Sequence, residues 1–232
     1  MNVMVSLINK KKIKTEYNKF NSFAEKYEQF VSNSLGTPWF GWDDLSGKRA
    51  IDIGCGAGQA AKVLSEKFEK VIGLDLCAEL IDLAKKKHSN PNITYIIEDF
   101  MKFESEENFD FVYSHTMMHH LENYEEGLLK MKSLVSKGGK LVIIDNVSDK
   151  YPTPPEWVYT LPAKIEFIPN IFKIGIKKAW FLFTFWHNKE WLNHLASDTY
   201  LSRKEFNELY TKVFPDSEIV DLGFANAVKW IK

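Results

Sequence analysis

The sequence predicts an α/β protein with a doubly wound, seven-stranded, mostly parallel sheet that ends in an antiparallel hairpin. A short β-branched run at 50–53 breaks into alternate glycines at 54–58, and an amphipathic helical pattern follows at once. Apolar strand patterns then alternate with helical ones for about a hundred residues, which is typical of a parallel sheet covered on both faces. Two alternating segments close the chain, and the short turn Gly223-Phe224-Ala225 between them indicates the hairpin.

The individual elements follow from apolar runs and helix breakers. Residues 15–34 carry apolar side chains at steps of three or four, as an amphipathic helix does, and Pro38 disfavours helix just before it. Gly138-Gly139 is a helix stop that feeds the fifth strand. The apolar runs predict strands at 49–53, 71–75, 93–98, 109–114, 140–145, 217–222 and 226–231. The helical patterns predict helices near 58–68, 77–88 and 121–136.

Residues 147–198 depart from this alternation. Three prolines lie close together at 152, 154 and 155, and the segment holds eleven aromatic residues. Regular patterning returns at Ser202, a helix N-cap with Glu205 as its capping-box partner, and predicts a helix to about residue 213. The segment is therefore an insertion between the fifth strand and the last helix.

Length and composition set the broad class. A chain of 232 residues predicts one domain over residues 1–232, and a net charge of −1 gives no general attraction to nucleic acid. Cys55 and Cys77 are too few for a disulfide framework and lack zinc spacing, so we expect a reducing, cytoplasmic setting and no metal. No apolar run approaches the ~18 residues of a membrane span, and residues 1–14 show no signal peptide.

The alternate glycines point to a ligand. A chain that reverses this tightly needs positive φ angles, and a ligand pressed on the turn leaves no room for Cβ atoms. The pattern Gly54-x-Gly56-x-Gly58 differs from the dehydrogenase fingerprint, because Gln59 stands where its third glycine would fall. Asp75 ends the second strand, where a carboxylate can accept hydrogen bonds from the two hydroxyls of an adenosine ribose.

With these motifs the chain resembles the class I S-adenosylmethionine-dependent methyltransferases over most of its length. AIDIGCGAGQ at 50–59 resembles the family's first motif, and VIGLD at 71–75 resembles the second. IIEDF at 96–100 and FDFVYSHTMMHHL at 109–121 are similar to its third- and fourth-strand motifs, and LVSKGGKLVIID at 134–145 is similar to the segment leading into the fifth strand. The closing hairpin matches the family's sixth and seventh strands, whose reversed order distinguishes this Rossmann-like fold from dehydrogenase folds.

The resemblance implies that S-adenosyl-L-methionine binds here and leaves as S-adenosyl-L-homocysteine. The glycine loop would contact the methionine part, and Asp75 would hold the ribose. Asp99 would accept from the adenine amino group, with Leu76 and Phe100 flanking the ring. The implied cofactor-binding residues are Tyr17, Tyr27, Asp52, Gly54, Cys55, Gly56, Gly58, Asp75, Leu76, Asp99, Phe100, Ser114 and His115.

Several of these residues have a structural alternative. Asp52 either contacts the ligand or pairs backbone N–H groups of the glycine loop. Tyr17 and Tyr27 either close over the cofactor, as aromatic residues of the N-terminal helix often do in the family, or pack in the core. Cys55 is small enough for the turn, which explains it without a reactive thiol. Ser114 and His115, just past the fourth strand, would lie beside the sulfonium.

Three histidines, His115, His119 and His120, are candidate catalytic bases. Methyl transfer is an in-line displacement, so an enzyme mainly orients the two reactants. A hydroxyl acceptor usually needs a base, and histidine serves near neutral pH, whereas an amine has only to arrive unprotonated. The alternative is that a histidine at this position caps or packs the next helix.

The aromatic insertion at 147–198 lies where relatives insert their substrate-recognition elements. It either forms a lid over an apolar or aromatic substrate pocket or a small core that docks on the sheet. Five lysines against two glutamates between Ala163 and Trp191, mixed with aromatic residues, are also typical of an interfacial helix against anionic lipid.

The expected function is N- or O-methylation of a small or medium-sized, apolar or aromatic acceptor. Nucleobase amino methylation is disfavoured, because residues 114–117 lack an Asn/Asp-Pro-Pro-aromatic clamp. Two alternatives are a nicotinamide-dependent oxidoreductase and a non-catalytic cofactor-binding or membrane-peripheral protein. The glycine spacing and the hairpin argue against the oxidoreductase.

Overall fold

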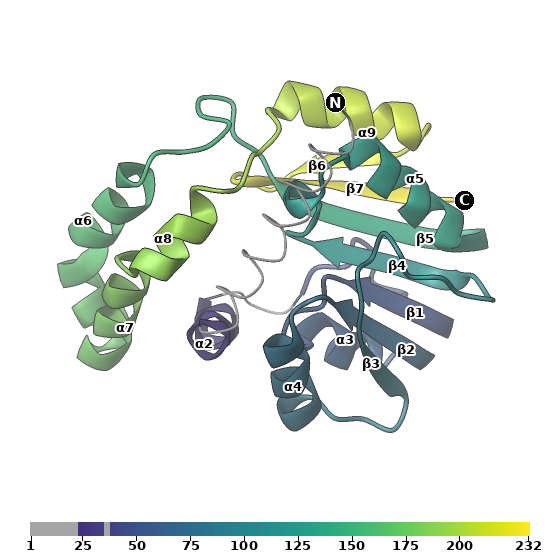
Figure 1. Cartoon of the computed structure of the whole chain (residues 1–232), viewed down its shortest axis with the longest axis horizontal. Helices are drawn as coiled ribbons and strands as arrows, with labels where there is room; N and C mark the ends of the chain where they lie inside the picture. Colours follow the sequence, from purple (N-terminus) through teal and green to yellow (C-terminus); the bar gives the residue numbers. More distant parts are fainter. Residues whose placement is uncertain (1–22, 35–37) are drawn as a thin grey trace, which may run out of the picture. The chain divides into compact units, whose positions relative to one another are not determined.

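The computed structural model describes residues 23–34 and 38–232 (Figure 1). Tyr17 and the first part of the predicted N-terminal helix lie outside the described residues. The described chain falls into two compact units. Of the described residues, the helical unit comprises 23–34 and 153–198, and the sheet unit comprises 38–152 and 199–232.

The sheet unit is built on a seven-stranded sheet with the order β3-β2-β1-β4-β5-β7-β6. Its strands are β1 (Gly47–Ile53), β2 (Phe68–Asp75), β3 (Ile93–Ile97), β4 (Phe109–His115), β5 (Val135–Asn146), β6 (Glu218–Asp221) and β7 (Ala225–Ile231). Strands β1 to β5 pair in parallel, while β7 runs antiparallel to both β5 and β6. The predicted fold class is confirmed, and the strand order reverses between β1 and β4, where ligands bind in doubly wound sheets.

Both faces of this sheet are covered, as the near-continuous apolar strands predict. In β5, Leu141 and Ile143 belong to one buried cluster, and Val142 and Ile144 to another. This alternation follows from the two-residue period of a strand. The first cluster includes residues of α5 (Tyr124–Leu134) and α9 (Arg203–Val213), and the second includes residues of α3 (Gln59–Leu64). Helix α4 (Ala78–Lys87) and the short 3-10 helix η1 (Met118–His120) complete the unit.

Two predicted helix ends are wrong, and in both cases a strand begins earlier than expected. The helix predicted to reach residue 68 ends at Leu64, because Phe68 already belongs to β2 and its ring stacks on Phe111 at 5.9 Å. The helix predicted to reach residue 136 ends at Leu134, and β5 begins at Val135. Gly138, with φ at 76°, therefore lies inside a strand rather than at a helix stop.

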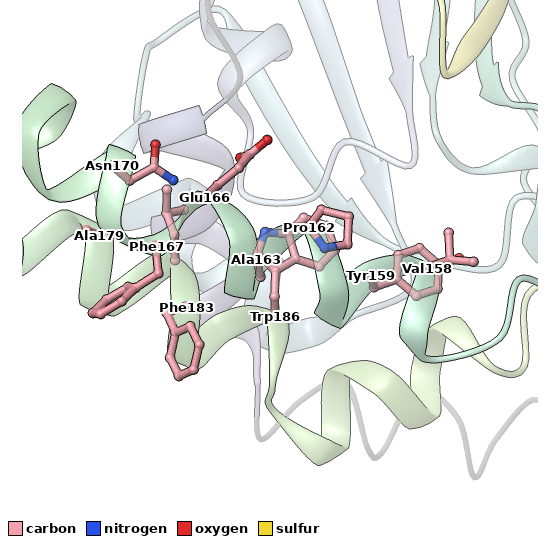
Figure 2. A pocket seen from close by; sticks show the side chains of 11 residues that line it. Val158, Tyr159, Pro162, Ala163, Glu166, Phe167, Asn170, Ala179, Phe183 and Trp186 are labelled. Atoms are coloured by element: carbon pink, nitrogen blue, oxygen red, sulfur yellow. The ribbon is translucent and has the colours of Figure 1, made fainter.

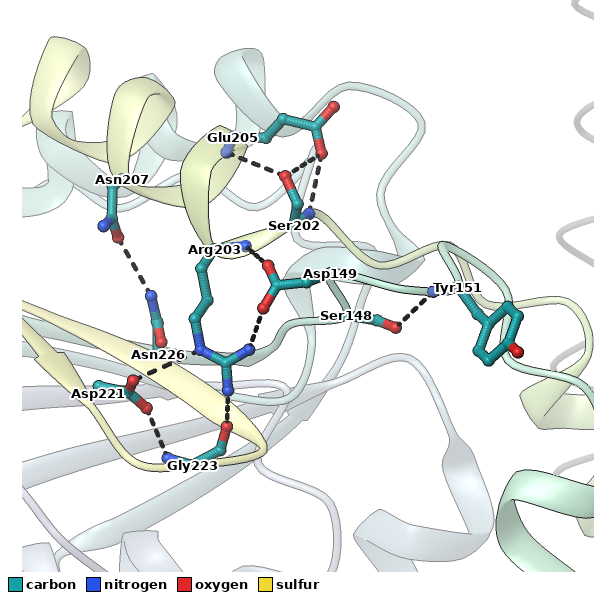
Figure 3. Close-up of polar contacts among 10 residues, drawn as sticks. All are labelled: Ser148, Asp149, Tyr151, Ser202, Arg203, Glu205, Asn207, Asp221, Gly223 and Asn226. Carbon is teal, nitrogen blue, oxygen red and sulfur yellow. Dashed lines mark hydrogen bonds and ion pairs between the residues drawn. The ribbon is translucent and has the colours of Figure 1, made fainter.

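The start of α9 is fixed by the predicted capping box and by one arginine (Figure 3). Ser202 N donates to Glu205 Oε2 at 2.8 Å, and Glu205 N donates back to Ser202 Oγ at 3.2 Å. Arg203 donates its backbone N–H to Asp149 Oδ1 at 2.8 Å, and its guanidinium contacts Asp149 and the Gly223 carbonyl. Arg203 therefore ties the chain after β5, the start of α9 and the β6–β7 turn together.

The helical unit contains α2 (Ala24–Ser34), α6 (Trp157–Ile174), α7 (Ile176–Trp186) and α8 (Lys189–Leu195). Its interior is mainly aromatic, with Phe23, Phe185, Trp191 and Leu195 buried together. Partly buried neighbours complete this cluster: Tyr27, Phe30, Tyr159, Phe181 and Trp186. Part of the aromatic insertion thus packs with α2, a segment far away in the sequence. No described helix is both long and apolar enough to cross a membrane.

Candidate cofactor site and active site

The glycine loop after β1 has the backbone that its sequence predicts. Gly54, Gly56 and Gly58 have φ angles of 74°, 52° and 84°, in the left-handed region that favours glycine. A Cβ atom at Gly54 would lie 2.6 Å from Met117, and one at Gly58 would lie 2.5 Å from the Tyr95 hydroxyl. A Cβ atom at Gly56 would meet no protein atom within 4 Å. The outer glycines are therefore required by packing, whereas the middle one borders open space.

Asp75 holds this loop in place from the end of β2. Its Oδ2 accepts a hydrogen bond from Gly56 N at 2.8 Å, and its Oδ1 accepts one from Cys77 N at 2.8 Å. Burial raises the pKa of the carboxyl above its usual value, and these backbone N–H groups oppose that rise. Each carboxylate oxygen can accept a second hydrogen bond. Asp75 can thus fix the loop and still accept from a ligand.

Asp52 lies deeper, with 2% of its surface exposed. Its Oδ2 accepts from Ala61 N at 3.0 Å, near the start of α3. Burial raises the pKa of this carboxyl to about 7, and the nearby Asp75 charge adds to the rise. Asp52 thus pairs with a backbone N–H group, which is the structural role considered for it in the sequence analysis. Direct contact between Asp52 and the cofactor stays a prediction. Cys55 is buried in the same turn, and burial raises the pKa of its thiol, which suits the non-reactive role.

The predicted adenine residues lie at the next strand end. Asp99 follows β3, accepts from Met101 N at 2.9 Å and lies 3.5 Å from Lys102 Nζ. Glu98 N donates to Asp75 O at 3.1 Å, so the Asp75 and Asp99 segments meet at one edge of the sheet. Phe100 is buried in the core cluster, and Leu76 is half-buried. The structure brings the two carboxylates to one edge but places the Phe100 ring in the core.

Ser114 and His115 end β4. The Ser114 hydroxyl is fully buried and donates to Ile53 O at 2.9 Å, which links β4 to β1. Burial lowers the pKa of His115, an effect that the nearby Asp145 carboxylate partly offsets. His115 is therefore neutral at neutral pH. For both residues, contact with a sulfonium stays a prediction.

His119 forms a buried pair with Asp145, a residue that sequence reasoning missed. His119 Nδ1 lies 2.6 Å from Asp145 Oδ1, and the two side chains are 4% and 1% exposed. A carboxylate accepts hydrogen bonds, so in this pair His119 would donate from Nδ1 to Asp145. A signal was available in the sequence, because a carboxylate that ends an apolar strand is costly without a partner. That argument applies to Asp145 at the end of β5 as it does to Asp75.

Aromatic rings surround this pair within the sheet unit. The rings of His120 and Tyr200 lie 4.1 and 5.1 Å from the His119 ring. The Tyr210 hydroxyl and Asp145 Oδ2 are buried and have no hydrogen-bond partner among the described residues. Burial and the Asp145 charge both raise the pKa of Tyr210, so its phenol stays protonated. The end of β5 is thus a buried polar cluster centred on Asp145.

The helical unit contains a cavity between α6 and α7 (Figure 2). It measures about 230 Å³ and is lined mainly by aromatic and aliphatic side chains, among them Tyr159, Phe167 and Trp186. Glu166 and Asn170 are its polar members. Tyr27, predicted to close over the cofactor, packs at 5.6 Å against the Trp191 ring in this unit's core. Tyr27 therefore packs in a core, which was the alternative to closing over the cofactor.

Known proteins resemble the part of the sheet unit that carries the glycine loop. Residues 51–143 match the model of a family described as a methyltransferase domain. This part of the chain is therefore similar to methyltransferase domains. The match runs from Ile51 in β1 to Ile143 in β5. It includes the glycine loop, Asp75, Asp99 and the three histidines, and it ends before Asp145.

Individual methyltransferases are similar to part of this chain at modest identity. An uncharacterized methyltransferase of Mycobacterium bovis is 30% identical over 99 residues, which are 42% of this chain and 50% of that protein. The 2-phytyl-1,4-naphtoquinone methyltransferase of Synechocystis is 27% identical over 143 residues, 58% of this chain and 59% of that one. The chain thus spans about half the length of the curated relatives it matches.

Solved structures share the fold. The DhpI–SAH complex superimposes with a TM-score of 0.64 at 13% identity, over 94% of this chain and 95% of that one. The likeness therefore extends beyond the residues that match the domain model. At this identity it shows the fold alone.

Proposed function

We propose that this protein is an S-adenosylmethionine-dependent methyltransferase that acts on a small or medium-sized, apolar or aromatic acceptor. The observation that carries the proposal is the glycine loop, held by Asp75 and left open over Gly56. A ligand can approach the backbone there more closely than any side chain would allow. The methyltransferase domain match covers the same residues.

The residues present fit S-adenosylmethionine, which supplies a methyl group on a sulfonium. Gly56 and its neighbours offer backbone groups to the methionine part, and Asp75 has acceptor capacity left for two ribose hydroxyls. Asp99, at the same edge, offers a carboxylate to the adenine amino group. The two carboxylates also favour a cationic ligand over a neutral one.

His119 is the candidate base for a hydroxyl acceptor, and Asp145 is its positioning residue. With Nδ1–H held by Asp145, His119 Nε2 would take the hydroxyl proton while the acceptor oxygen bonds to the methyl carbon. The carbon–sulfur bond breaks in the same step, and its electron pair stays on sulfur. An amine acceptor that arrives unprotonated needs no such base. If His119 only packs the next helix, replacing it should lower the rate of methyl transfer only as far as it lowers the amount of folded protein.

Two features support an apolar or aromatic acceptor. The cavity of the helical unit is lined mainly by aromatic and aliphatic side chains with few polar groups, as sites for apolar ligands are. The name of the Synechocystis relative specifies a phytyl naphthoquinone, an aromatic ring with an apolar tail. We propose that this cavity can hold an apolar ligand.

Thermal denaturation with two ligands tests the proposal. A ligand that binds only the folded state stabilises it by ~2.7 kcal/mol at a hundred times its dissociation constant. S-adenosylhomocysteine should therefore raise the melting temperature, and a nicotinamide dinucleotide should not. A rise with the dinucleotide alone would favour the oxidoreductase instead. A rise with S-adenosylhomocysteine but no methyl transfer to any apolar phenol or amine would favour the non-catalytic alternative.

A further inference from the structure

One face of α6 exposes a continuous apolar stripe. Its members recur at steps of three or four, so they fall within roughly 80° of arc on a helix that turns ~100° per residue. They are Trp157, Leu161, Ile165, Ile168 and Phe172, with exposed fractions of 53%, 47%, 67%, 58% and 85%. The opposite side of α6 faces α7, where the Phe167 ring contacts those of Trp180 and Phe183. The contacts of Phe167 with α7 therefore come from outside the five α6 residues of the stripe.

The stripe continues onto α7 and concentrates exposed apolar surface there. Ile176 and Trp180 are 64% and 57% exposed. Among the described residues fourteen large hydrophobic side chains are exposed, and eight of them lie in α6 and α7. The other six are scattered through the sheet unit, as single exposed apolar residues usually are. Concentration on one helix pair marks an interaction surface.

The charges around this stripe are basic. Residues 157–186 carry four lysines and one glutamate, a net charge of +3 on a chain whose overall charge is −1. Lys164 lies beside the stripe, and Lys173, Lys177 and Lys178 gather at the junction of α6 and α7. All four lysines are exposed. An apolar stripe with Trp and Phe, flanked by exposed lysines, is complementary to an anionic lipid surface.

The helix itself suits an interface better than the interior of a bilayer. No described helix is a candidate membrane span. Pro162 and Pro169 lie inside α6, and because proline has no N–H, the carbonyl groups four residues earlier lose their usual helical partner. Such groups need water or another donor, which the hydrocarbon core does not supply. A helix lying at the headgroup level keeps them hydrated.

We propose that the stripe on α6 and α7 docks this protein onto an anionic lipid bilayer. The apolar side chains insert below the headgroups, Trp157 and Trp180 lie at the interfacial level that tryptophan favours, and the lysines contact lipid phosphates. This function is additional to cofactor binding, because no stripe residue belongs to the glycine loop or the strand ends.

Co-sedimentation of the full chain with vesicles tests the proposal. We expect the protein to pellet with vesicles of phosphatidylcholine containing roughly one third phosphatidylglycerol, and much less with phosphatidylcholine alone. The double variant Ile165→Ser/Phe172→Ser should lower the partition coefficient by roughly tenfold or more. Lys173→Glu/Lys177→Glu should remove the preference for anionic vesicles. Phe224→Ser is the matched control, because Phe224 is 67% exposed but lies in the β6–β7 turn, and it should bind as wild type does.

Three results would overturn the proposal. One is that the folded wild-type chain stays in the supernatant with anionic vesicles. Another is that the stripe variant and the Phe224 control bind equally well. The third is a concentration-dependent dimer in sedimentation velocity that the stripe variant abolishes, without vesicle binding, because a second copy would then cover the stripe. S-adenosylhomocysteine binding is measured on the same samples. It confirms folding, and it distinguishes a failure of lipid binding from a failure of the proposed enzymatic function.

Discussion

The sheet unit and the helical unit differ in how far their polar side chains find partners and their apolar side chains are buried. In the sheet unit, the strand-end carboxylates Asp52, Asp75 and Asp145 each find a backbone or histidine partner, and both sheet faces are covered. In the helical unit, α6 leaves an apolar stripe in contact with solvent although the unit has an aromatic core. The strand-end carboxylates and apolar faces of the sheet unit thus find their partners within that unit, whereas the helical unit exposes an apolar surface to solvent.

The largest expected effect separates the core of the helical unit from its stripe. Phe185 is 2% exposed and stacks on Phe30 at 4.1 Å, so Phe185→Ala should lower the free energy of unfolding by roughly 3–5 kcal/mol. Phe172 is 85% exposed, and Phe172→Ala should change it by less than about 0.5 kcal/mol. Urea denaturation followed by tryptophan fluorescence measures both. Equal effects would show that the stripe is part of the core.

Two glycines of the loop should respond differently to alanine. Gly54→Ala combines a positive φ with a clash against Met117 and should cost roughly 3 kcal/mol of stability. Gly56→Ala carries only the backbone strain, about 1–2 kcal/mol, yet it should weaken S-adenosylhomocysteine binding because its methyl group enters the open space. Chemical denaturation and calorimetric titration separate the two effects. Unchanged binding by a folded Gly56→Ala variant would contradict the placement of the cofactor over this residue.

Removing the proposed base should slow the transfer to a hydroxyl acceptor. His119→Gln should lower kcat by roughly 100-fold, and Asp145→Asn should also lower it, because the tautomer of His119 is no longer fixed. S-adenosylhomocysteine affinity should stay at the wild-type value in both, which checks the fold. A kcat that follows only the loss of folded protein would assign His119 to packing.

Asp52 should make the sheet unit less stable as the pH rises. Its pKa is about 7 in the folded state against a usual 3.8, so the folded state binds an extra proton between these values. The stabilisation is complete below pH 3.8 and is lost as the pH rises to about 7. Between pH 5 and pH 7 the free energy of unfolding should fall by roughly 2 kcal/mol more in the wild type than in Asp52→Asn. Parallel pH profiles of the two proteins in urea denaturation would contradict the raised pKa.

The sequence predicted the sheet unit well because its signals are local. A positive φ at Gly54 and a carboxylate at the end of a β-branched strand are visible in a few consecutive residues. The helix ends at Leu64 and Leu134 were misplaced because Phe68 and Val135 suit either element until their strand partners are known. Asp145 was missed because its partner His119 lies 26 residues earlier.

The helical unit could be predicted only in part. Its aromatic content is evident, but which aromatic residues are buried depends on α2, which precedes α7 by more than a hundred residues in the sequence. Phe30 and Phe185 stack, while Phe172 and Trp180 stay exposed, and no local pattern distinguishes the two pairs.

Calorimetric titration of the full chain with S-adenosylhomocysteine tests the central claim, that the glycine loop and Asp75 form a cofactor site. The account predicts binding at one site per chain, weakened by roughly tenfold or more in Asp75→Asn, because a charge-assisted acceptor for the ribose is lost. The folded Phe224→Ser variant serves as a control and should bind as the wild type does. Absence of binding by the folded wild-type chain, or equal affinity in Asp75→Asn, would contradict it.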